Sequence, residues 1–271
     1  ERDGYKMDCP YNTVFNALNH RAYADMAAIA AILGKDGDAL TFTRLADRLR
    51  AAMISRLYDP VDGLFMDGLN EDGIPADHAS QHATAFCLDC GVYEDQNMAD
   101  AMAKALEQDG EIRMSVYGAF FLLEGLYRSG HGEIANRLLL NPDASEGART
   151  WAYMVYTLGA TVTTEAWNER NKPNMTLSHP WGAAPAHMIT SGILGVTPTA
   201  PAYESFDVRP SVQARGRVSG RIPTLRGPIS LALEQDEEAL TVTLDVPVNT
   251  TATVYLPGGD IRTVGSGIPV L

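Results

Sequence analysis

Apolar residues recur at helical spacing from about residue 12 to about residue 195, and glycine or proline repeatedly interrupts the pattern. An alanine-rich stretch follows the cap residues at 11–13 and ends at Gly34. The next predicted helix starts at Asp36 and ends before 58–60. The glycines that follow predict a loop or small hairpin. Further helices are predicted over 77–90, 94–106, 115–129, 133–140, 149–158 and 181–194. Short turns between them favour antiparallel pairs, so we expect a helical toroid or solenoid rather than a βαβ fold.

The pattern changes to a period of two beyond residue 203, after a linker at 197–201. Alternating segments at 229–233, 240–244 and 251–256 are separated by turn residues, as in antiparallel strands. The sequence therefore predicts a mainly α-helical domain over 1–200, followed by a small antiparallel β-sandwich over 201–271.

Composition narrows the class of partner. The formal charge is −13, which disfavours nucleic acid and anionic membrane surfaces and favours a neutral polar ligand. The three cysteines have no framework spacing, and no apolar run reaches the ~18 residues of a membrane span. The chain opens on Glu1 with no visible signal peptide and reads like mid-chain sequence, so we expect processing or missing upstream residues. The compartment, cytoplasmic or periplasmic, is not indicated.

The most informative chemistry lies between the last two predicted helices. Glu165 follows a run of polar and β-branched residues and precedes Trp167, and His179 and Trp181 come shortly afterwards. Tryptophan offers a flat apolar face to a pyranose ring, and a carboxylate can act as base, nucleophile or hydroxyl acceptor. This combination is typical of a sugar pocket.

Seven segments in this order resemble the C-terminal half of bacterial α-L-rhamnosidases of glycoside hydrolase family 78. The resemblance covers nearly the whole chain and implies an (α/α)6 barrel, a C-terminal β-sandwich, and hydrolysis of terminal L-rhamnose with inversion. The segments are Gly4-Tyr5, Pro10-Tyr11-Asn12-Thr13, Asp77-His78-Ala79-Ser80-Gln81-His82-Ala83, Ser115-Val116-Tyr117-Gly118-Ala119, Thr163-Thr164-Glu165-Ala166-Trp167, Ser178-His179-Pro180-Trp181-Gly182 and Phe206-Asp207-Val208-Arg209-Pro210.

The resemblance implies that Glu165 is the general base that activates water, and that His179 contacts the sugar. The general acid of the family lies upstream, in an Asp-Cys-Pro-x-Arg-Asp-Glu stretch. The segment Asp8-Cys9-Pro10 echoes that stretch but continues Tyr11-Asn12-Thr13, so the acid is expected to be absent. The predicted helices also fall short of the twelve of a closed ring, so a homo-oligomer or an upstream segment is expected to cover its open flanks.

Other residues are weaker candidates for the same pocket. Trp167 is either a wall of the pocket or part of the core, and Trp181 opens a helix where packing is favoured. Tyr117, Tyr11, His78 and His82 are further candidates for sugar contact. His78 and His82 with Cys87 and Cys90 could sketch a zinc site, but four ligands on one straight helix cannot surround one ion, so no metal is expected. Glu169 lies in a solvated stretch and is not expected to pair with Glu165.

The leading hypothesis is an inverting α-L-rhamnosidase-like glycosidase that requires no metal or organic cofactor. Its transition state is cationic at the ring, so an acidic pocket is expected. A rival hypothesis is a catalytically inactive relative that binds carbohydrate or serves in assembly. A third is an unsaturated-uronide hydrolase, which the low Lys and Arg content disfavours because an anionic sugar usually requires an arginine clamp.

Overall fold

The computed structural model describes residues 4–108, 110–211, 216–237 and 239–271, which divide into two compact units, 1–182 and 183–271. The last helical segment belongs to the second unit, because it is continuous with the first strand of a sheet in that unit. The boundary between the units therefore precedes residue 200, and the predicted domain limits stay a prediction.

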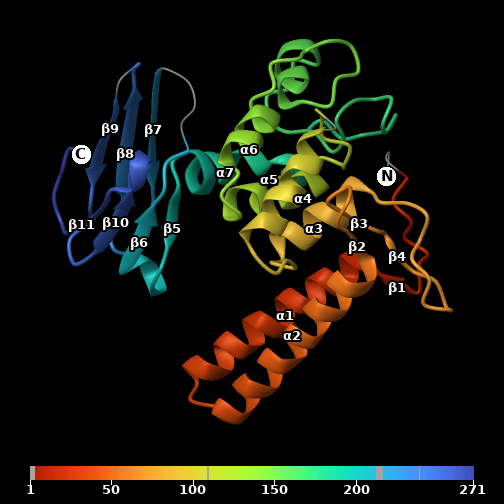
Figure 1. Ribbon diagram of the computed structural model, residues 1–271. Coiled ribbons are helices and arrows are strands. Elements are labelled where there is room, and N and C mark those ends of the chain that lie inside the picture. Colours follow the sequence, from red (N-terminus) through yellow and green to blue (C-terminus); the bar gives the residue numbers. More distant parts are fainter. Residues whose placement is uncertain (1–3, 109, 212–215, 238) are drawn as a thin grey trace. The chain divides into compact units, whose positions relative to one another are not determined.

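The described residues of the first unit contain three pairs of consecutive α-helices (Figure 1). They are α1 (Thr13–Ile32) and α2 (Asp36–Leu57), α3 (Gln81–Asp89) and α4 (Gln96–Gln108), and α5 (Gly118–Arg128) and α6 (Gly132–Leu139). The Asn12 side chain caps α1 by accepting the backbone N–H of Phe15 at 3.1 Å, and Gly34 ends the turn after the helix with a φ of +68°. These boundaries confirm most of the predicted helices to within a few residues.

Helix α3 is buried along its whole length and packs against α1, α4 and α5. It starts at Gln81 with Ser80 as its cap, four residues later than predicted. Asp67 explains the later start of the helix. Its carboxylate accepts a hydrogen bond from the backbone N–H of Ser80 and forms a second hydrogen bond with Nδ1 of His78. These two hydrogen bonds hold the segment before α3 in an extended conformation, so His78 and His82 do not share a helical face.

Two short antiparallel strand pairs accompany these helices. Strand β2 (Tyr58–Asp59) pairs with β3 (Leu64–Phe65) as a small hairpin, one of the two forms predicted from the glycines. Strand β1 (Tyr11–Asn12) pairs with β4 (Gly68–Leu69) across the α1–α2 hairpin. A Cβ on Gly68 would lie 2.6 Å from the backbone oxygen of Tyr11, so only glycine permits the approach of β1 and β4. This pairing brings the segment before α1 against the loop that contains Asp67.

The outer face of α1 is apolar and open to solvent. Its exposed residues Phe15, Leu18, Ala22, Met26 and Ile29 are spaced three or four residues apart and therefore lie along one side of the helix. Figure 1 shows α1 and α2 extending away from α3 and α4, so the far part of this hairpin lacks helical neighbours among the described residues of its unit. Exposed apolar stripes of this kind are common where a helix packs against a further element or a partner.

The chain between α6 and residue 182 is largely irregular. A π-helical turn, η1 (Tyr153–Thr157), replaces most of the helix predicted over 149–158, and a single 3-10 turn, η2 (Pro180–Gly182), ends the unit. Hydrogen bonds from side chains to the backbone hold this region, including those of Asn168 to Gly147 and of Trp151 to Gly182. Glu165 lies in the middle of it.

The second unit is a β-sandwich preceded by α7 (Ala184–Met188) and the π-helical η3 (Ile189–Ile193). One sheet has the order β11-β10-β6-β5 and the other the order β7-β8-β9. Apolar side chains from both sheets form its core, among them Phe206, Val254, Leu231 and Val242. The strands are β5 (Val196–Pro198), β6 (Ser205–Val208), β7 (Gly216–Ile222), β8 (Ile229–Gln235), β9 (Leu240–Asp245), β10 (Thr251–Tyr255) and β11 (Ile261–Val264).

The predicted fold class, a helical region followed by a small β-sandwich, is confirmed, with one difference in strand direction. Strands β6 and β10 are parallel, whereas every other pairing between named strands of the sandwich is antiparallel. Closure of the helices into a toroid stays a prediction. Within the described residues, no helix combines the length and the apolar character needed to cross a bilayer.

Candidate active site

Glu165 is held by the irregular loop at the end of the first unit. Its backbone N–H donates to the carbonyl of Thr176 at 3.0 Å, and its own carbonyl accepts the indole N–H of Trp181 at 2.8 Å. A second clasp links the two arms of the loop, because the N–H of His179 donates to the carbonyl of Thr163 at 2.8 Å. The backbone around the carboxylate is therefore fixed without a helix or a strand.

Both oxygens of the Glu165 carboxylate have partners. The Lys172 ammonium lies 2.7 Å from Oε1, while Oε2 accepts the backbone N–H of Thr176 at 2.9 Å and its hydroxyl at 3.3 Å. The Lys172 contact is the main reason that the pKa of Glu165 is lowered, and the Thr176 amide and the charge of His179 contribute further. The group is therefore ionised at neutral pH, as a base must be, although each of these contacts also reduces its basicity.

The carboxylate lies at a cavity of about 300 Å³. Two of the predicted residues, Trp167 and Trp181, line this cavity together with Glu165. Arg149 and Lys172 also line it, so the pocket is not the uniformly acidic one expected from the sequence. Glu165 is the one carboxylate among its described lining residues. The complete set of those residues is Ser115, Val116, Arg149, Glu165, Ala166, Trp167, Asn171, Lys172 and Trp181.

Trp181 is partly exposed and is hydrogen-bonded to the backbone of Glu165. Its side chain is 42% exposed, its N–H is used by the Glu165 carbonyl, and its ring stacks on His179 with centroids 4.5 Å apart. The centroid of the exposed Tyr117 ring lies 5.7 Å from that of Trp181. The structure therefore brings His179 and Tyr117 to Trp181, although neither is among the residues that line the cavity. Clustered aromatic rings are the kind of surface that the apolar face of a sugar contacts.

Trp167 is a core residue that reaches the cavity with only a small part of its surface. It is 1% exposed, its N–H donates to the Met114 carbonyl at 2.7 Å, and its ring packs edge-to-face against Trp151 at 4.9 Å. Of the two readings open from the sequence, packing therefore describes Trp167, whereas Trp181 is more exposed than its predicted packing role required. The roles of both in sugar binding stay predictions.

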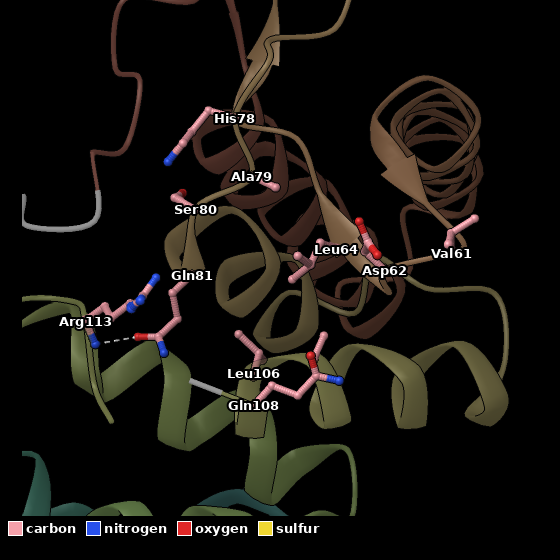
Figure 2. A pocket seen from close by; sticks show the side chains of 11 residues that line it. Val61, Asp62, Leu64, His78, Ala79, Ser80, Gln81, Leu106, Gln108 and Arg113 are labelled. Carbon is pink, nitrogen blue, oxygen red and sulfur yellow. Dashed lines mark hydrogen bonds between the residues drawn. The ribbon is translucent and has the colours of Figure 1, made fainter. Parts of the chain in front are cut away.

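His78 lies at a different cavity, of about 440 Å³, shown in Figure 2. The buried Asp67 carboxylate lies 2.7 Å from Nδ1 of His78, and it also accepts the backbone N–H groups of Lys6 and Ser80. The Gln81 side-chain oxygen accepts the backbone N–H of Arg113 at 2.8 Å, as Figure 2 shows. The structure therefore does not bring His78 to the Glu165 cavity.

The two remaining candidates also lie apart from the Glu165 cavity. His82 is buried inside α3 and stacks on Tyr5 with ring centroids 5.2 Å apart, and Tyr11 is exposed on β1 opposite Leu69. Neither lines either cavity. The described residues also contain no cluster of three or more His, Cys, Asp or Glu side chains suited to a metal ion.

Sequence reasoning missed Lys172, Arg149 and Asp67. The Lys172 stretch reads as a solvated loop, because Asn, Arg and Lys residues surround Glu169, and nothing local shows that the chain turns back onto Glu165. Asp67 follows a predicted turn, where an aspartate is ordinary. Its burial with three donors was the only signal of its importance, and burial is visible only in the structure.

Residues 3–193 match the family described as the bacterial alpha-L-rhamnosidase six-hairpin glycosidase domain, and residues 195–268 match the bacterial alpha-L-rhamnosidase C-terminal domain. The chain therefore belongs to the bacterial α-L-rhamnosidase six-hairpin glycosidase family. An α-L-rhamnosidase of Formosa agariphila is 24% identical over 270 residues, and one of Streptomyces avermitilis is 28% identical over 249 residues. These matches cover 95% and 86% of this chain.

Solved structures agree with this assignment at the level of the fold. The Streptomyces avermitilis α-L-rhamnosidase complexed with L-rhamnose matches 99% of the chain with a TM-score of 0.75 and 22% identity. A family 78 rhamnosidase of Bacillus sp. GL1 matches 92% of it with a TM-score of 0.73 and 24% identity. The chain spans only 27% and 22% of the two relatives by sequence, and 28% and 26% of these two structures.

Proposed function

We propose that this chain carries the water-activating half of an inverting α-L-rhamnosidase, with Glu165 as the general base. The observation that supports this most directly is the ionised carboxylate of Glu165, a residue that lines a cavity and whose backbone carbonyl accepts the indole N–H of the exposed Trp181. An inverting glycosidase needs a carboxylate on the face of the sugar opposite the leaving group, where it removes a proton from the attacking water.

The other residues would bind and orient the sugar. Trp181, with His179 and Tyr117 beside it, offers apolar surface to the pyranose ring, while ring hydroxyls face the polar side of the cavity near Arg149 and Asn171. Holding water and the anomeric carbon in line supplies much of the rate acceleration available to such a site. Terminal α-L-rhamnosyl residues are the proposed substrate, because the relatives that match the chain are α-L-rhamnosidases.

The general acid is proposed to come from polypeptide outside these residues. Glu165 is the one carboxylate among the described lining residues of its cavity, and inversion requires a second carboxyl group roughly 6.5–9.5 Å from the first. The exposed stripe on α1 is proposed to pack against a further helical segment, upstream in the same protein or from a second copy. Both proposals fit a chain that spans about a quarter of its relatives.

A chromogenic assay can test the base role of Glu165 even when the chain has no general acid. In 2,4-dinitrophenyl α-L-rhamnoside the leaving group departs without protonation, so a chain that lacks the acid should still hydrolyse it, and hydrolyse the p-nitrophenyl analogue much more slowly. Glu165→Gln should lower the rate by at least about 100-fold. Glu169→Gln is the matched control, because Glu169 is exposed in the same loop. Proton NMR of the first product should show β-L-rhamnose.

Equal rates for wild type and Glu165→Gln would reject the base assignment. If neither substrate is turned over but L-rhamnose binds, the second candidate function holds, which is a non-catalytic carbohydrate-binding or assembly relative. That alternative is favoured by one observation, the presence of two cations and a single carboxylate among the described residues that line the cavity.

A further inference from the structure

Lys172 contacts the Glu165 carboxylate at the oxygen that Thr176 leaves open. Its Nζ lies 2.7 Å from Oε1, while both contacts of Thr176 are made with Oε2. The Glu165 side chain is only 13% exposed, and that of Lys172 is 41% exposed. The pair is therefore shielded on the Glu165 side and open on the Lys172 side, so the lysine can bind or release the carboxylate without disturbing the core.

The backbone around Lys172 is fixed by its own turn. The Asn168 side-chain oxygen accepts the N–H of Asn171 at 3.1 Å, and the Asn168 carbonyl accepts the N–H of Lys172 at 3.3 Å. The N–H of Met175 returns to the carbonyl of Lys172 at 3.0 Å. Asn168 is itself buried and donates to the Gly147 carbonyl at 2.8 Å, so the turn is attached to the body of the unit. This hydrogen-bonded turn therefore fixes the backbone from which the Lys172 side chain reaches Glu165.

Three cationic or titratable groups contact Glu165, affect its charge or line its cavity. Lys172 comes from the 168–176 turn and is in direct contact, His179 comes from the returning arm of the loop, and Arg149 lines the same cavity. Of the groups that affect Glu165, Lys172 has the largest effect. A single substitution at Lys172 should therefore change the protonation of Glu165 while leaving the other contacts in place.

We propose that Lys172 is a positioning residue for Glu165, whose ammonium holds the carboxylate ionised at the cavity rim and so sets the lowest pH at which it can accept a proton from water. The inference rests on the proposed role of Glu165 as the base. The ion pair between Lys172 and Glu165 also slows proton transfer, because the same ammonium opposes protonation of Glu165 in the transition state. The pH range of the reaction is then a compromise fixed by one residue of the loop.

A carboxyl-carbon NMR titration measures the effect of Lys172 on the ionisation of Glu165 and does not require turnover. Protein labelled with ¹³C at the glutamate side-chain carboxyl is titrated from pH 2.5 to 8, and the Glu165 signal is identified by its loss in Glu165→Gln. Lys172→Met should raise the pKa of Glu165 by about one unit or more, and Lys172→Arg should restore most of the wild-type value. Arg170→Met, which removes a cation from the same turn, should shift the titration only slightly, because Arg170 lies beside Glu146.

A salt titration of the wild type gives a second, independent measurement. Raising the ionic strength from about 0.05 to about 0.5 M should raise the pKa of Glu165 in the wild type and change it little in Lys172→Met. A Glu165 titration that is the same in wild type and Lys172→Met would overturn the proposal. Failure of the base assignment would look different, because Glu165→Gln would then keep full activity whatever Lys172 does to the titration. Lys172→Gln is the second variant if Lys172→Met fails to fold.

Discussion

The indole N–H of Trp181 donates to the backbone carbonyl of Glu165 at 2.8 Å, across sixteen residues of chain. The partly exposed ring of Trp181 is therefore fixed to the backbone of Glu165, while separate contacts with Lys172 and Thr176 hold the carboxylate. Together these contacts explain how an irregular loop can hold a ring and a carboxylate in a defined mutual position, as a sugar site requires.

Replacing Trp181 should weaken L-rhamnose binding in two separable steps. Trp181→Phe keeps an aromatic face and loses the hydrogen bond to Glu165, so affinity should fall about five-fold, which corresponds to about 1 kcal/mol. Trp181→Ala also removes the face and should cost at least ten-fold. Isothermal titration with L-rhamnose measures both. Tyr117→Phe keeps its ring and serves as the control, and full affinity in Trp181→Ala would place the sugar elsewhere.

Asp67 should be a major stability determinant of the first unit. It is fully buried and accepts hydrogen bonds from two backbone amides and His78, so Asp67→Ala leaves buried donors unsatisfied. We expect the free energy of unfolding to fall by about 3 kcal/mol in urea denaturation. The exposed Asp72 lies in the neighbouring loop, and Asp72→Ala should change this free energy by less than about 0.5 kcal/mol. Similar losses in the two variants would contradict the assigned role.

Asp89 should make the protein less stable as the pH rises. Burial raises the pKa of Asp89 to about 6, and the nearby Arg128 and Arg21 lower it only in part. In the unfolded chain an aspartate has a pKa near 3.9. Between about pH 4 and pH 6, Asp89 is therefore mostly protonated in the folded state and mostly ionised in the unfolded state. The group's contribution is therefore fully favourable below pH 4 and is lost as the pH passes 6.

Asp89→Asn should remove this dependence. Its free energy of unfolding should exceed that of the wild type by up to about 3 kcal/mol at pH 7.5 and should match it near pH 4. Thermal melts across that range, with the exposed Asp72→Asn as control, measure the difference. A gain of equal size at both pH values would mean that packing, rather than charge, causes it.

Gly195 should tolerate no side chain. It has a φ of +70°, and a Cβ there would lie 1.9 Å from the Arg209 carbonyl oxygen, where the first strands of the sandwich meet. Gly258 also has a positive φ, of +84°, but a Cβ there meets nothing within 4 Å. Gly258→Ala should therefore cost about 1 kcal/mol, while Gly195→Ala should cost at least about 3 kcal/mol or abolish folding. Calorimetry of both variants checks this, and equal costs would show that the backbone relaxes around residue 195.

The sequence predicts the helices well where caps and glycines mark their ends. Asn12 and Gly34 bound α1 as expected, because their effects are local. The start of α3 could not be predicted in the same way, since it depends on Asp67, which lies thirteen residues before Ser80 in the chain. The parallel pairing of β6 with β10 is likewise invisible to a strand-by-strand pattern.

The candidate site is predictable in composition but not in arrangement. Glu165, His179 and Trp181 were selected from their residue types and from a family resemblance, and they do lie together. The same reasoning left Trp167 open between pocket wall and core and favoured packing for Trp181, yet Trp167 is the buried one, because it packs against Trp151 and the Met114 segment. Lys172 escaped notice since a lysine in a polar stretch usually faces solvent.

Most of the groups around the candidate carboxylate come from one continuous stretch, 163–181, that contains no α-helix and no strand. The rigid helices beneath it contribute little of the chemistry. The stretch also carries part of the core, because Trp167 and Asn168 within it are buried. Changes at its exposed positions, such as Trp181, could therefore alter which ligand fits, whereas loss of Trp167 would also destabilise the unit.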